Sequence, residues 1–131
     1  MEAAALKRIM MIEDDLDIQA VARLALETLG GFTVEVCSRG HEALETAPVF
    51  GPDLILIDVM MPGMDGPTTL QRLRAMPQTA LVPVVFMTAK VMPHEIDHYK
   101  TLGALGVIRK PFDPMTLSAT LTSIWNQHCV S

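Results

Sequence analysis

Short apolar runs alternate with stretches of helical periodicity along the whole chain. Five runs rich in Ile, Val, Leu, Met and Phe predict strands, because each is bounded by turn-forming or polar residues. Two of them, LILI and VVFM, lack any polar alternation, a pattern typical of strands buried on both faces of a parallel sheet. The predicted strands cover residues 7–12, 32–38, 53–58, 81–88 and 104–110.

The stretches between these runs predict five helices. Residues 14–29 place apolar side chains on one helical face, and Gly30-Gly31 supplies a left-handed stop. Pro48 and Gly51-Pro52 are expected to close the second helix, over residues 41–47. The remaining helices are predicted from the Asp65 cap through Arg74, over residues 94–102, and from Asp113 and Pro114 onward.

Strands that alternate with helices indicate βαβ units with right-handed crossovers. The pattern therefore predicts the α/β class: a doubly wound, five-stranded parallel sheet with five helices covering both of its faces. With 131 residues, the chain has the length of one ordinary domain, so a single domain over residues 1–131 is expected.

Composition narrows the classes of function. The net charge is −5, and the Lys and Arg residues are scattered, which argues against a direct nucleic-acid surface and favours a protein or small ligand as partner. No apolar stretch approaches the roughly 20 residues of a membrane span. Cys37 and Cys129 stand alone in the sequence, and two unpaired thiols fit a reducing, cytoplasmic compartment.

Polar residues follow four of the five predicted strands. Ligands of open parallel sheets bind outside the carboxyl ends of the strands, so these residues are candidates for a site. Most of them have a structural explanation when taken alone: Asp14 or Asp15 as a helix cap, Thr88 as a turn hydroxyl, Lys110 as a surface charge. Asp58 does not, because no helix-start signature follows it directly. Together they converge on one edge. They are Glu13, Asp14 and Asp15 after the first strand, Asp58 after the third, Thr88 after the fourth and Lys110 after the fifth.

Carboxylates gathered at one edge repel one another unless a cation lies among them. Oxygen ligands suit Mg²⁺, and the absence of His and Cys from these strand ends disfavours zinc. A carboxylate beside a metal, a lysine and a hydroxyl is equipped for phosphoryl transfer, with the acid as nucleophile and the cations offsetting charge on the phosphoryl oxygens.

Four motifs, in this order and spacing, closely resemble the receiver domain of two-component response regulators. They are IEDD (12–15), DVMMPGMDG (58–66), FMTAK (86–90) and RKPF (109–112). The resemblance covers nearly the entire chain. It implies a flavodoxin-like sheet with strand order 2-1-3-4-5, and a switch point between the first and third strands.

The resemblance also implies a role for each site residue. Asp58 would be the phosphoacceptor. Asp15 would hold Mg²⁺ directly, Asp14 would do so largely through water, and the backbone carbonyl of Met60 would be the third protein ligand. Thr88 and Lys110 would bind the phosphoryl group, and the Lys110-Pro111 peptide would be cis. The implied partners are a sensor histidine kinase or phosphotransfer protein, and a downstream protein target.

One position departs from the family pattern. Val107 stands where the family usually carries an aromatic ring that moves with the threonine, so that ring movement is not transferred to this chain. Tyr99, on the preceding helix, is expected to be a surface aromatic rather than a substitute.

Other functions remain open at this point. The chain can be a receiver fragment of a larger transcription factor or hybrid kinase, or a pseudo-receiver that binds partners without being phosphorylated. An aspartyl-phosphate phosphatase is disfavoured because Met60 stands where its second acid is needed. A flavin-binding module is disfavoured because the acids after the first strand would repel a phosphate.

Overall fold

The computed structural model describes residues 5–130, which contain one five-stranded parallel sheet in the order β2-β1-β3-β4-β5. The predicted topology and strand order are confirmed. The strands are shorter than the apolar runs that predicted them, and the last one stops at Arg109, which leaves Lys110 just beyond the sheet. They are β1 (Arg8–Ile12), β2 (Thr33–Cys37), β3 (Leu54–Asp58), β4 (Val84–Thr88) and β5 (Gly106–Arg109).

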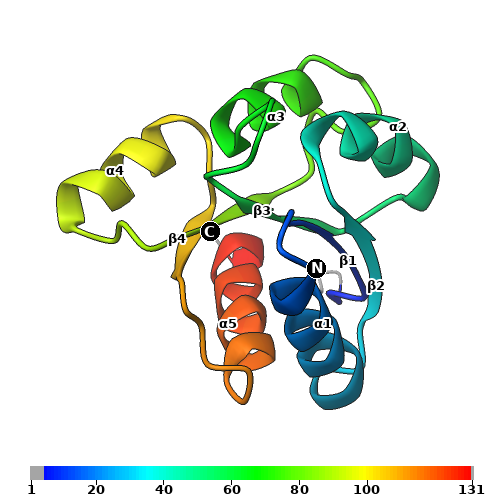
Figure 1. Cartoon of the computed structure of the whole chain (residues 1–131), viewed down its shortest axis with the longest axis vertical. Coiled ribbons are helices and arrows are strands. Elements are labelled where there is room, and N and C mark those ends of the chain that lie inside the picture. Colours follow the sequence, from blue (N-terminus) through cyan, green and yellow to red (C-terminus); the bar gives the residue numbers. More distant parts are fainter. Residues whose placement is uncertain (1–4, 131) are drawn as a thin grey trace.

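The helices form a layer on each face of the sheet. Helices α1 and α5 cover one face, and α2, α3 and α4 cover the other (Figure 1). A π-helical turn, η1, continues α1 toward β2. The helical elements are α1 (Leu16–Leu24), η1 (Ala25–Leu29), α2 (Gly40–Phe50), α3 (Gly66–Arg74), α4 (Pro93–Thr101) and α5 (Leu117–Val130).

Side-chain alternation along the strands divides the interior into two cores. In β3, Leu54 and Leu56 pack toward α1 and α5, whereas Ile55 and Ile57 pack toward α2, α3 and α4. All four side chains are fully buried. The apolar run in the sequence therefore reflects a central strand with no solvent-facing side, and Asp58 is the carboxylate at its end.

The predicted helices differ in part from the structure. The first helix ends at Leu29 as predicted, but its last five residues form a π turn. The last helix begins at Leu117, not at Pro114. Of the two expected stops of the second helix, Pro48 does not close it, since α2 continues to Phe50 and stops at Gly51, which has a φ of +67°. A proline in the last turn removes only one backbone donor, and the left-handed glycine provides the actual stop.

Tyr99 is buried, contrary to the expectation of a surface aromatic. Its side chain is only 8% exposed, and its ring meets that of Phe86 edge-on, with centroids 5.5 Å apart. Phe86 in turn pairs in register with Val107 on β5. The aromatic contact of this core therefore joins α4 to β4, the strand that ends on Thr88.

Several local predictions are confirmed. Asp65 caps α3, with its carboxylate accepting from the Thr68 amide at 2.8 Å. The Lys110-Pro111 peptide is cis, and Cys37 and Cys129 are both free thiols. Among the described residues, no helix has the length and apolar character needed to cross a bilayer.

Candidate functional site

The candidate site lies at the carboxyl ends of four neighbouring strands. Glu13 and Asp14 follow β1, Asp58 ends β3, Thr88 ends β4, and Lys110 follows β5. Because β1, β3, β4 and β5 are consecutive in the sheet, their ends deliver these side chains to one edge.

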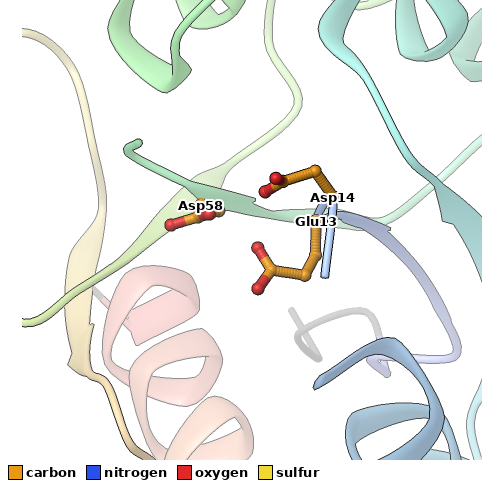
Figure 2. A group of neighbouring side chains, drawn as sticks. All are labelled: Glu13, Asp14 and Asp58. Carbon is orange, nitrogen blue, oxygen red and sulfur yellow. The ribbon is translucent and has the colours of Figure 1, made fainter. Parts of the chain in front are cut away.

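Three carboxylates converge at this edge. Glu13, Asp14 and Asp58 each offer an oxygen atom, and these atoms lie within 4.8 Å of one another. Figure 2 shows the Glu13 and Asp14 side chains extending from the end of β1 toward the side where Asp58 lies. Glu13 is fully buried and Asp58 is 4% exposed, whereas Asp14 is open to solvent. The cluster thus consists of two buried acids and one exposed acid.

The structure does not bring Asp15 into this cluster, and its expected role as a direct metal ligand stays a prediction. Asp15 is the N-cap of α1, and its carboxylate accepts hydrogen bonds from the amides of Asp17 at 2.9 Å and Ile18 at 3.1 Å. These bonds satisfy two of the free amides of the first helical turn. Glu13 instead joins Asp14 and Asp58.

Lys110 bridges the two buried acids. Its ammonium group lies 2.9 Å from Glu13 Oε1 and 3.3 Å from Asp58 Oδ1. Burial alone would lower the pKa of Lys110, but its hydrogen bond to Glu13 and the charge of Asp58 outweigh this and raise the pKa. Lys110 therefore stays charged and holds one positive group beside the carboxylates.

The surroundings of Glu13 disfavour its charged form more than Lys110 favours it. Burial, together with hydrogen bonding to Asp58, raises the pKa of Glu13 to about 8 despite the contact with Lys110. Its second oxygen, Oε2, is buried without a hydrogen-bond partner. An orphaned buried oxygen among three acids is what a bound cation would satisfy, so these residues fit a metal with oxygen ligands.

Further hydrogen bonds connect the residues at the ends of β3, β4 and β5. The main-chain amide of Lys110 donates to the Thr88 carbonyl at 2.9 Å. The Thr88 hydroxyl is buried and accepts from the Lys90 amide at 3.1 Å. The Met60 amide lies 3.4 Å from Asp58 Oδ1, and its side chain is 71% exposed. A role for the Met60 carbonyl as a ligand stays a prediction.

Gly66 fixes the loop that leaves Asp58. Its amide donates to the Val59 carbonyl at 3.0 Å. A Cβ at this position would lie 2.7 Å from the Asp58 carbonyl oxygen and 2.9 Å from the Val59 Cα. Both neighbours are main-chain atoms that cannot rotate away, so α3 begins this close to the strand only because residue 66 is glycine.

Glu13 is the site residue that the sequence analysis left without a role. Three consecutive acids follow β1. If the predicted end of the strand is moved by one residue, a different pair of these acids is assigned to the site. The start of the following helix is the signal that separates them. In the structure Asp15 caps α1, so the two acids before it are the ones available to the site.

Comparisons with known proteins agree with this geometry. A family model described as "Response regulator receiver domain" matches residues 9–122. The alkaline phosphatase synthesis transcriptional regulatory protein PhoP of Bacillus subtilis is 34% identical over 118 residues, which are 90% of this chain and 48% of PhoP. Response regulator Rre1 of Synechocystis is 32% identical over 117 residues, 88% of this chain and 50% of Rre1. The chain thus spans about half the length of these curated relatives.

A solved structure of similar length matches the fold as a whole. The chemotaxis protein CheY4 of Vibrio cholerae superposes with a TM-score of 0.83 at 31% sequence identity, over 92% of this chain and 99% of that one.

Proposed function

The chain belongs to the response regulator receiver domain family, and from this premise we propose that it is a switch in which Asp58 accepts a phosphoryl group from a phosphohistidine. The observation that carries the proposal is the placement of Asp58. Its carboxylate ends the central strand, is 4% exposed, and lies 3.3 Å from a lysine ammonium at the ligand edge of the sheet.

In the proposed step, an Asp58 carboxylate oxygen forms a bond to phosphorus while the P–N bond of the phosphohistidine breaks. The electron pair of that bond leaves with the imidazole, whose other ring nitrogen carries a proton, so the donor is left as neutral histidine. Lys110 would offset charge on the phosphoryl oxygens. The Thr88 hydroxyl accepts from the Lys90 amide, which leaves its own proton to donate to one of these oxygens.

We infer that Asp14, Asp58 and the Met60 carbonyl hold Mg²⁺, with Glu13 beside them. Bound there, Mg²⁺ supplies the positive charge that lets an anionic carboxylate approach an anionic phosphoryl group. The donor set supports this assignment, since carboxylates and a carbonyl are oxygen ligands and one exposed side leaves room for water.

In this function the chain is a signalling domain rather than an enzyme that turns over external substrates. Met60 stands two residues after Asp58, and its thioether cannot act as the acid-base group that an aspartyl-phosphate phosphatase needs there. A sensor histidine kinase or phosphotransfer protein would supply the phosphoryl group, and a downstream protein would read the modified edge. Free thiols at Cys37 and Cys129 support placing the domain in the cytoplasm.

The test is phosphorylation by a small donor. Incubation of the protein with Mg²⁺ and phosphoramidate should add one phosphoryl group, measured by intact-mass spectrometry, and chelation of the metal should prevent it. Asp58→Asn should abolish the addition, because the amide is a far weaker nucleophile than the carboxylate.

Asp97→Asn is the matched control, since Asp97 is an exposed acid on α4 that is not part of the acidic cluster. This variant should be labelled as fast as the wild type. A phosphoryl group that persists in Asp58→Asn would overturn the assignment of the acceptor.

A further inference from the structure

Gln19, on the second turn of α1, hydrogen-bonds to the residues on both sides of Asp14. Its main-chain amide donates to the Asp15 carbonyl at 3.0 Å. Its side-chain amide donates to the Glu13 carbonyl, and also to the Ser38 hydroxyl at 3.1 Å. One glutamine therefore brackets the only solvent-exposed acid of the cluster.

The geometry of the helix explains why Gln19 reaches the end of β1. Side chains on an α-helix tilt toward its N-terminus, so Gln19 points back over the first turn toward the strand. The carbonyl of Glu13 can only accept a hydrogen bond, which requires the nitrogen of the Gln19 amide to face it. Ser38, at the end of β2, takes the second proton of the same nitrogen and holds the amide in that orientation.

Fixing the Glu13 carbonyl fixes the start of Asp14. The carbonyl oxygen of Glu13 and the Cα of Asp14 belong to one planar peptide unit, so they move together. The other side of Glu13 is also held, because its amide donates to the Cys37 carbonyl at 3.0 Å. Asp14 is itself exposed, and its direction therefore depends on how this peptide plane and the Asp15 cap are held.

We propose that Gln19 is a positioning residue for the metal site: through the Glu13 carbonyl, its side-chain amide holds Asp14 in the direction that faces Asp58. The inference rests on the proposed function, because it takes Asp14 to be a ligand of Mg²⁺. Gln19 does not itself contact the metal or the phosphoryl group.

The test measures Mg²⁺ affinity by calorimetric titration without any phosphoryl donor. Gln19→Glu keeps the shape of the side chain but replaces the donor with an oxygen that repels the Glu13 carbonyl. Mg²⁺ should bind about tenfold more weakly, as for other losses of supporting hydrogen bonds around metal ligands. The added negative charge alone would strengthen binding, so positioning and charge predict opposite signs.

Gln71 is an exposed glutamine on α3, far in the sequence from residues 13–15. Gln71→Glu therefore adds the same charge without removing the Gln19 hydrogen bonds, and it should not weaken Mg²⁺ binding. Gln19→Met removes the donor without adding charge, and it should also weaken Mg²⁺ binding severalfold. The thermal midpoint without metal is measured for every variant, because a merely structural glutamine would lower that midpoint and leave the affinity of the folded protein unchanged.

Wild-type affinity for Mg²⁺ in both folded Gln19 variants would overturn the positioning role while leaving the proposed function intact. If the wild-type protein itself neither binds Mg²⁺ nor is labelled at Asp58, the proposed function fails, and the positioning role fails with it.

Discussion

Two adjacent acids after β1 have different surroundings: Asp14 lies in the acidic cluster, whereas Asp15 caps α1. Single substitutions should separate their roles. Asp14→Ala removes an exposed carboxylate from the cluster, so Mg²⁺ binding and Mg²⁺-dependent labelling should be lost with little change in stability. Asp15→Ala removes the α1 cap, which should cost about 1 kcal/mol of unfolding free energy and leave a functional metal site.

Calorimetric Mg²⁺ titration and chemical denaturation of both variants provide the measurements. The opposite pattern, with metal binding lost in Asp15→Ala and kept in Asp14→Ala, would restore the ligand set implied by the family resemblance alone.

The sequence predicted the edge of the site but not every residue in it. Asp58, Thr88 and Lys110 were found because each follows a run that can only be a strand, so their positions do not depend on the exact boundary. The acids after β1 were harder, because strand, site and helix cap follow one another without a spacer and all three residues are acidic. Only the hydrogen bonds of Asp15 separate the cap from the cluster.

At the scale of elements, the start of α3 lies close against the main chain of Asp58. Gly66→Ala places a methyl group against two main-chain atoms, so the loop after β3 must shift. We expect a loss of about 1–3 kcal/mol in unfolding free energy, as for other overpacked sites. Labelling of the folded protein at Asp58 should also slow, because the acceptor and its neighbours move with the loop.

Gly51→Ala is the matched control for this element. Gly51 has a positive φ but nothing within 4 Å of its added Cβ, and it lies at the opposite edge of the sheet. The control should lose stability from backbone strain and still be labelled at the wild-type rate. Equal labelling rates in Gly66→Ala and the wild type would show that the close approach of α3 does not position the acceptor.

Helix α4 shows where an element escapes prediction. Its sequence, PHEIDHYKT, is so polar that its contact with the sheet depends on few side chains, and Tyr99 is the one that is buried. An isolated aromatic in a polar stretch reads as a surface residue, because no apolar stripe marks the inner face. The partner ring of Phe86, which decides the matter, is distant in sequence.

For the whole molecule, the acidic cluster should make stability depend on the metal. The carboxylates of Asp14 and Asp58 lie close together beside the buried Glu13, and a bound cation offsets their charge only in the folded chain. Mg²⁺ at about 100 times its dissociation constant should add about 2.7 kcal/mol to the free energy of unfolding.

Thermal melts with and without Mg²⁺ measure this effect as a rise in the midpoint. Ca²⁺-free, Mg²⁺-free protein in the same buffer is the reference, and Asp14→Ala should show little or no rise. An equal rise in Asp14→Ala and the wild type would mean that the metal stabilises the fold from another site.

The acidic cluster lies at the carboxyl ends of the strands, and the opposite ends of the strands lie away from it. Leu81, which precedes β4 at those opposite ends, is 94% exposed. Cys37 is buried, and burial raises the pKa of its thiol to about 12, which shields it from thiol reagents at neutral pH. A Leu81→Cys, Cys129→Ser variant would thus carry one reactive thiol, by which the domain can be anchored to a sensor chip with Asp58 facing the solution. A candidate kinase or output protein passed over that chip would meet the acidic cluster unobstructed, in either phosphorylation state.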